Sequence, residues 1–205
     1  MHRISLGGRL ARATSVLALA SAAACSGITD TLLEATDPDL VNPGDTESIE
    51  GARGLAIGTV SRLTAITGGA ESTWLFGGLL ADEWATSSTF VQNDETDQRR
   101  IQENNSQISN MLYRLYRVRT SADQAIAGLK KWEPAATTSI GEQYFARGFV
   151  ELQLASDFCN GIPLSNGAAV PVTYGQPQTV AQVFATALAS FDSAITSIGS
   201  ATDSA

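Results

Sequence analysis

Apolar residues recur every three or four positions in four stretches of the chain, which is the pattern of amphipathic helices. The stretches predict helices over residues 46–67, 106–131, 138–158 and 179–198. The second is the clearest, because its apolar stripe is almost unbroken and it ends in two lysines, which suit a helix C-terminus. The stripe consists of Ile108, Met111, Leu112, Leu115, Val118, Ala122, Ala125, Ile126 and Leu129.

Local signals support these boundaries. Gly68 and Gly69 can stop the first helix, and Thr179 with Gln182 forms a capping-box pattern at the start of the last one. In the third helix we expect the inward side chains to be Ile140, Phe145, Gly148, Phe149, Leu152 and Ala155. The last helix carries one apolar face, formed by Val183, Phe184, Ala187, Leu188, Phe191, Ala194, Ile195 and Ile198.

The segments between these helices are less regular. Residues 72–84, STWLFGGLLADEW, predict a further, weaker helix, because its two glycines lower the helix propensity. Residues 85–107 are polar and predict a long loop. Residues 159–178 are rich in glycine and proline, so we expect an irregular connection with at most a short strand near residues 169–172.

Together these elements predict an all-α fold of tetratricopeptide-like helical hairpins with long irregular loops, over residues 45–205. No helix follows residue 198 to cover the apolar face of the last helix, so we expect the fold to be incomplete. We then expect residues 25–205 alone to be marginally stable and to self-associate. The alternative is that the last helix packs fully on the two helices before it.

The N-terminus has the pattern of an export signal. Three arginines and no acidic residue precede a short apolar run that ends at Ala24, so residues 1–24 are interpreted as a signal peptide. Cys25 then offers the thiol that takes a lipid, and residues 25–44 are predicted to be an extended tether. Ala22 stands where such sites usually have leucine, so ordinary cleavage without lipidation is the alternative.

Charge and composition narrow the possible functions. Without residues 1–24 the chain would keep ten bases against 21 acids, a net charge of about −11. Such a charge argues against nucleic acid and anionic surfaces as partners. The single histidine, His2, would leave with the signal, so we expect no imidazole chemistry, no metal site and no cofactor. Cys159 would be the only free thiol, and we expect it to be a small buried side chain.

The order of the motifs resembles the SusD/RagB family of nutrient-uptake outer-membrane lipoproteins. Cys25 and the acidic tether are followed by GLLADEW, MLYRLYRVRTSADQAI, EQYFARGFVELQLASDFCNGIPLS and TVAQVFATALASFDSAI. In the family's motif an Arg-Ala helix ends in an aromatic residue, a glycine and a Pro-Leu pair. Here those places are taken by Arg147, Phe149, Phe158, Gly161, Pro163 and Leu164. Gly148 replaces the usual alanine, and Cys159 stands where many members have a tyrosine. The resemblance covers nearly all of this chain but only the N-terminal part of the family's longer members.

The resemblance implies a surface-exposed protein, held by lipid in the outer membrane, that partners a TonB-dependent, SusC-like transporter. Such a protein captures a glycan or peptide without changing it, so it is not an enzyme. A helical-repeat envelope scaffold without a small-molecule ligand is the second hypothesis. A glycosidase using Asp82 and Glu83, or the acids of residues 94–97, is the third.

Candidate ligand-binding residues gather in and beside the polar segment. Sugars are bound by aromatic faces together with amides, carboxylates and arginines, and this segment supplies Trp84, Phe90, Gln92, Asn93 and Arg99. The resemblance adds Asp82 and Glu83. The alternative is that Trp84 packs in the core at a helix end and that the loop is merely solvated. Trp74 and Trp132 are interpreted as core or interface residues. Tyr113 and Tyr116 lie off the apolar stripe, so they either fill the neighbouring hairpin, which is the favoured interpretation, or face a partner.

Overall fold

Helices form almost all of the structure, a computed structural model that describes residues 46–69 and 72–199. They are α3 (Ile49–Thr67), α4 (Thr73–Leu80), α5 (Val91–Asp97), α6 (Ser106–Trp132), α7 (Thr137–Asp157) and α8 (Val180–Ile198). The fold is all-α, as predicted. The predicted signal peptide, Cys25 and tether lie outside the described residues. Within the described ranges, no helix is long and apolar enough to cross a membrane.

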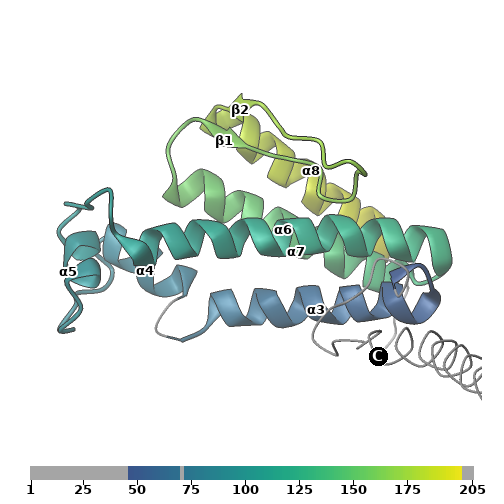
Figure 1. Cartoon of the computed structure of the whole chain (residues 1–205), viewed down its shortest axis with the longest axis horizontal. Coiled ribbons are helices and arrows are strands. Elements are labelled where there is room, and N and C mark those ends of the chain that lie inside the picture. The colour runs from purple at the N-terminus through teal and green to yellow at the C-terminus, as the bar shows by residue number, and fades with distance from the viewer. Residues whose placement is uncertain (1–45, 70–71, 200–205) are drawn as a thin grey trace, which may run out of the picture. The chain divides into compact units, whose positions relative to one another are not determined.

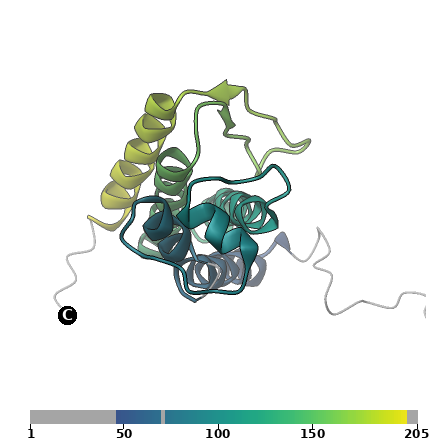
Figure 2. The same cartoon turned by 90° about the vertical axis from the view of Figure 1, so that its left-hand side faces the viewer.

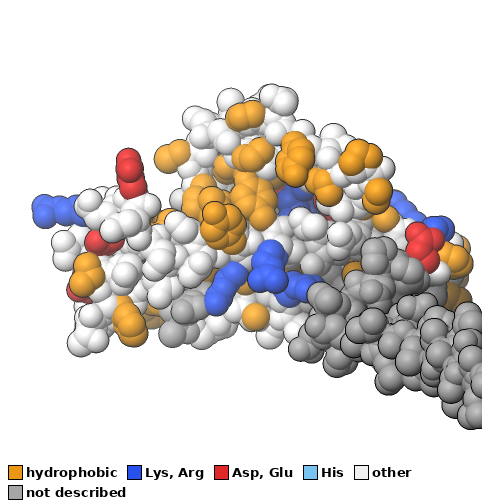
Figure 3. Space-filling model, in the orientation of Figure 1, with side chains coloured by type: hydrophobic (Ala, Val, Ile, Leu, Met, Phe, Trp, Pro, Cys, Tyr) orange, Lys and Arg blue, Asp and Glu red, His pale blue; other side chains and the backbone are white. Residues whose placement is uncertain are grey.

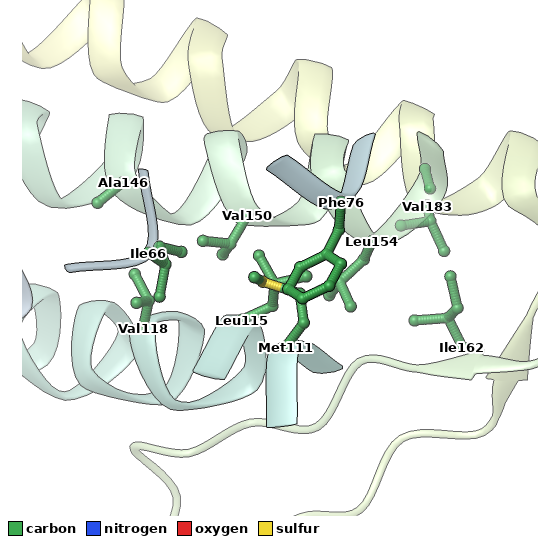
Figure 4. Packing of buried hydrophobic residues seen from close by; sticks show 11 residues of the cluster. Ile66, Phe76, Met111, Leu115, Val118, Ala146, Val150, Leu154, Ile162 and Val183 are labelled. Atoms are coloured by element: carbon green, nitrogen blue, oxygen red, sulfur yellow. The ribbon is translucent and has the colours of Figure 1, made fainter. Parts of the chain in front are cut away.

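Three long helices, α3, α6 and α7, pack side by side, and α8 lies against α7 (Figures 1 and 2). The short helices α4 and α5 lie at the end of the bundle where α6 begins. The core is apolar and draws on every long helix (Figure 4). Its centre includes Leu115 and Val118 of α6 with Val150 and Leu154 of α7, all four fully buried. Each such burial stabilises the fold by roughly 1.5–3 kcal/mol.

Two glycines allow α7 and α8 to pack closely. Gly141 and Gly148 are seven residues apart and therefore lie on one face of α7. A Cβ atom at Gly141 would lie 3.1 Å from the carbonyl oxygen of Ala194, and one at Gly148 would lie 3.2 Å from that of Ala187. The side chains of Ile198 and Phe191 of α8 lie over these two glycines. The buried residues of α8 are Val183, Ala187, Ser190 and Ala194.

A buried network of charges joins α6, α7 and α8. The fully buried carboxylate of Glu151 accepts hydrogen bonds from Arg119 Nε at 2.9 Å and from Ser190 Oγ at 2.7 Å. Asp123 accepts from Arg119 at 3.3 Å and from Arg147 at 3.2 Å. Arg119 also donates to the carbonyl oxygen of Ser165, in the connection between α7 and α8. Two guanidinium groups thus face two carboxylates, and the network fixes how the three helices and this connection align.

The predicted boundaries of the four long helices are confirmed to within a few residues, and the capping box at Thr179 and Gln182 is present. The prediction of one long loop over residues 85–107 is wrong, because α5 lies within it. This helix has no side-chain N-cap and almost no apolar residues, so no periodicity reveals it. Residues 169–172, where the sequence allows at most a short strand, form none. The short strands are β1 (Ile162–Pro163) and β2 (Pro177–Gln178), which pair antiparallel.

Several side chains expected to be inside are not. Trp74 is 66% exposed and Phe145 is 49% exposed. Trp132 is partly exposed, with the Lys131 ammonium 4.8 Å from its ring centroid, and Cys159 is exposed. Apolar spacing identifies which side chains could face inward, but whether they are covered depends on which neighbouring helix lies there.

Candidate functional site

The segment between α4 and α6 forms a lobe at the end of the bundle, and Asn105 anchors it. The side-chain oxygen of Asn105 accepts hydrogen bonds from the backbone N–H groups of Gln107 and Ile108, both at 3.1 Å, and so caps α6. Its amide nitrogen donates to the carbonyl oxygen of Gln92 at 3.0 Å and to the carboxylate of Glu95 at 2.8 Å. One buried side chain therefore ties α5 to the first turn of α6.

Two of the predicted ligand residues, Asp82 and Arg99, bind each other. Arg99 Nη1 donates to Asp82 Oδ1 at 2.7 Å and to the carbonyl oxygen of Leu80 at 3.3 Å. This hydrogen bond raises the pKa of Arg99 above its usual value. Both residues have left-handed backbones, with φ of 59° and 54°, at the two ends of the segment that they close. Their pairing stabilises the shape of the lobe.

Trp84 lies with its indole against α4, at a position where only glycine fits. A Cβ atom at Gly78 would lie 1.5 Å from Trp84 Cδ1, so any larger residue there would displace the ring. The backbone N–H of Trp84 also donates to the carbonyl oxygen of Gly78 at 3.1 Å. With the residue still 53% exposed, one part of the indole is packed and the rest is open to solvent.

The remaining predicted residues lie on α5 or beside it. Phe90 directly precedes α5 and is 62% exposed. Asn93 donates from its side chain to Ser88 Oγ at 3.4 Å, while Gln92 has its backbone carbonyl bound by Asn105. Phe90 is thus open to solvent, whereas Gln92 and Asn93 are partly buried. Two of the carboxylates that a glycosidase could use in this segment are engaged, since Asp97 accepts a hydrogen bond from the backbone N–H of Thr86 and Glu95 accepts one from Asn105.

A cleft of about 390 Å³ lies between α4 and the C-terminal end of α7, next to the lobe. It brings an exposed aromatic ring, Trp74, together with two carboxylates, Glu83 and Asp157, and with the amide of Gln153. Of the seven ligand residues predicted from the sequence, Glu83 alone lines this cleft. The other lining residues are Thr73, Gly77, Gly78, Phe149 and Ser156.

Asp157 is the least satisfied group in the cleft. Its Oδ2 atom is buried and receives no hydrogen bond from the described residues. Burial raises the pKa of Asp157 to about 6. An unpaired buried oxygen of this kind costs about 1–3 kcal/mol, so the side chain is ready to accept a hydrogen bond from a ligand. A hydroxyl or an amide N–H would serve equally well as the donor.

The cleft therefore offers one flat apolar surface and several polar groups at its walls. This combination suits a neutral polar ligand with an apolar face, such as a sugar ring. No cluster of three or more metal-binding side chains occurs in the part of the chain that the structure describes.

Sequence reasoning missed most of this site. The pattern predicts a core or interface role for Trp74, because apolar spacing cannot show whether a neighbouring element covers the ring. Asp157 did carry a signal, because it occupies the last turn of α7, where the helix dipole disfavours a negative charge. An acidic residue that breaks a local rule in this way is a reason to look for a function. Gln153 and Ser156 carry no comparable signal.

Comparisons of the chain with protein-family models, with curated proteins and with solved structures find no match.

The raised pKa of Asp157 predicts how stability depends on pH. The folded state binds this proton more tightly than the unfolded state does, so the contribution is favourable at low pH and is lost as the pH rises through about 6. Asp157→Asn should reduce the pH dependence of the free energy of unfolding between about pH 4 and pH 7. After allowance for partial exposure, it should raise the free energy of unfolding at neutral pH by about 1 kcal/mol. Urea unfolding at several pH values measures this.

The matched control is Asp192→Asn, which removes one exposed carboxylate from α8. An Asp157→Asn variant with the same pH dependence as the unaltered protein would show that the Asp157 carboxylate is well hydrated in solution.

Proposed function

We propose that this protein is a lipid-anchored, surface-exposed substrate-binding protein of the outer membrane, similar to the SusD/RagB family. It captures a glycan or peptide in the cleft at Trp74 and passes it, chemically unchanged, to a TonB-dependent transporter. The observation that carries the proposal is the exposed indole of Trp74 beside the unpaired carboxylate of Asp157. The sequence resemblance supports the proposal, and so do the helical hairpins that α6 forms with α7 and α7 forms with α8. We propose in addition that these hairpins are arranged as in tetratricopeptide repeats.

The fold also supports contact with another protein. Large apolar side chains are exposed along α8, among them Leu188 at 64% and Ile195 at 69%. An exposed apolar surface of this kind is typical of a protein-binding face. It fits docking to a transporter, and it fits equally well the second hypothesis, an envelope scaffold. Ligand binding distinguishes the two hypotheses, because a scaffold protein is not expected to bind a ligand in the cleft at Trp74.

The test is the affinity of the full-length protein for a panel of neutral oligosaccharides and short peptides, measured by calorimetry. Trp74→Ala should weaken binding of the best ligand by roughly tenfold or more, because a stacked aromatic ring contributes about 1 kcal/mol beyond the area that it buries. Trp132→Ala, which removes a partly exposed indole from the C-terminal end of α6, is the matched control. Equal affinity in the Trp74→Ala variant, or no binding of any ligand, would overturn the proposal and favour the scaffold.

A further inference from the structure

A second surface of the protein has a different chemistry. Two adjoining clefts, of about 530 and 420 Å³, lie where α3 and α6 are side by side, and both are lined by Arg62 and Arg117. Figure 3 shows Lys and Arg side chains gathered over this part of the molecule. We call the two clefts together the arginine groove. Its other lining residues are Ala65, Ile66, Tyr113, Arg114, Tyr116, Val118, Thr120 and Ser121.

Among the residues that the structure describes, no acidic one lines the arginine groove, although the chain has 21 acidic residues against 13 basic ones. Other clefts of the described structure differ in this respect. The cleft at Arg53 includes Glu133 and Glu142, and the one at Arg147 includes Asp123. The distribution of charge therefore sets this groove apart from the rest of an acidic protein.

Arg62 and Arg117 also differ from other arginines in their partners. Arg53, Arg99, Arg119 and Arg147 each form a salt bridge with a carboxylate. Within residues 46–69 and 72–199, neither Arg62 nor Arg117 has such a partner. Arg62 instead donates to the hydroxyl of Ser121 at 3.1 Å, which joins α3 to α6 and holds the guanidinium group at the groove. The remaining N–H groups of both arginines are open to an anion.

An aromatic ring stands at the edge of the groove. Tyr113 is 67% exposed, so the prediction that it packs against a neighbouring helix is wrong. Tyr116, by contrast, is partly buried against the core. A flat ring beside two guanidinium groups suits a ligand that carries both an apolar face and a negative charge.

We propose that the arginine groove binds an acidic sugar chain, with carboxylates of uronic acid residues held by Arg62 and Arg117 and a sugar ring against Tyr113. The inference rests on the proposed function for the sugar, whereas the requirement for an anion follows from the groove alone. A guanidinium group binds a carboxylate through two parallel hydrogen bonds, which gives both strength and orientation. The arginine groove would then favour negatively charged ligands, whereas the cleft at Trp74, which is lined by carboxylates, would not.

The negative charge of the whole protein does not prevent this binding. At physiological ionic strength the Debye length is about 8 Å, so distant carboxylates are largely screened. Arg62 and Arg117 would contact the ligand directly and are screened much less. The net electrostatic interaction with an acidic ligand is then an attraction. Added salt screens this attraction, so binding should weaken as the salt concentration rises.

The probe is tri-galacturonic acid, titrated into the full-length protein in a calorimeter, with neutral maltotriose as the comparison. We expect the double variant Arg62→Gln/Arg117→Gln to bind the acidic probe roughly tenfold or more weakly than the unaltered protein. Arg100→Gln, which removes an exposed positive charge on the lobe, should bind it unchanged. Arg117→Lys keeps the charge but loses the planar fork, so it should show an intermediate affinity.

The outcomes separate this inference from the proposed function. Equal binding of tri-galacturonic acid to the unaltered protein and the double variant, or no binding at all, would overturn the inference. Loss of binding in Trp74→Ala but not in the double variant would overturn it too, while leaving the proposed function intact. Loss in the double variant alone, with thermal unfolding unchanged, would establish the arginine groove whatever the cleft at Trp74 binds.

Discussion

Glu151→Ala is expected to lower the free energy of unfolding by about 3–5 kcal/mol, a large part of the ~5–15 kcal/mol that stabilises a typical domain. Glu151 is fully buried and accepts hydrogen bonds from Arg119 and Ser190. Without it, Arg119 and Arg147 would share the single carboxylate of Asp123, and one buried positive charge would lack a counter-charge. Urea unfolding followed by circular dichroism measures the loss.

Glu142→Ala is the matched control, because Glu142 is an exposed residue of the same helix. It should change the free energy of unfolding by no more than about 0.5 kcal/mol. Glu151→Gln should fall between the two variants, since glutamine keeps the shape and an acceptor oxygen but not the charge. A loss below about 1 kcal/mol for Glu151→Ala would mean that water replaces the carboxylate, and that the network contributes little to stability.

Leu188→Ser/Ile195→Ser is expected to convert a self-associating protein into a monomer. One side of α8 carries Phe184, Leu188, Phe191, Ile195 and Ile198, at spacings of four, three, four and three. Such spacing places them in one row, suited to packing against another helix. Leu188 and Ile195 are its most exposed members, whereas Phe191 and Ile198 also contact α7. The exposure of Leu188 and Ile195 agrees with the sequence-based expectation of an uncovered apolar face, and α8 packs mainly on α7.

The size of the effect follows from the area that would be buried. In a symmetric dimer the two substitutions remove four exposed apolar side chains, each contributing roughly 1 kcal/mol or more, so the dissociation constant should rise at least about a thousandfold. Sedimentation over a range of protein concentrations measures this. Ala185→Ser/Ala189→Ser, at two exposed small residues of α8, is the control and should leave association unchanged. A protein that is monomeric without any substitution would contradict the prediction.

The sequence predicts the long helices well because each of them buries a continuous apolar stripe. Met111, Leu115, Val118 and Leu129 are all buried as their spacing predicts. The same spacing fails for Phe145 and Trp74, because exposure depends on the neighbours of a helix and not on its own pattern. Helix α5 was missed for the opposite reason, since it is held by polar contacts from Asn105 and has no apolar stripe to detect.

The sequence predicts the region of the candidate site but not most of the residues that line it. Glu83 and the nearby Trp84 mark the right end of the bundle, but the cleft also needs Asp157, which is more than seventy residues away in the chain. Proximity of this kind arises from the packing of α4 on α7, which no local pattern encodes. Asp82 and Arg99 have the residue types of a sugar site, yet their salt bridge uses both of them within the lobe.

Asn105 couples movement of the lobe to the first turn of α6. Its oxygen caps the first turn of α6, and its nitrogen holds the Gln92 carbonyl and Glu95 of α5. If the lobe were to swing away from the bundle, the Asn105 side chain would either follow it and uncap α6, or stay and release α5. A ligand that moves the lobe would thus fray the start of α6, and a ligand that merely fills the cleft would leave that turn closed.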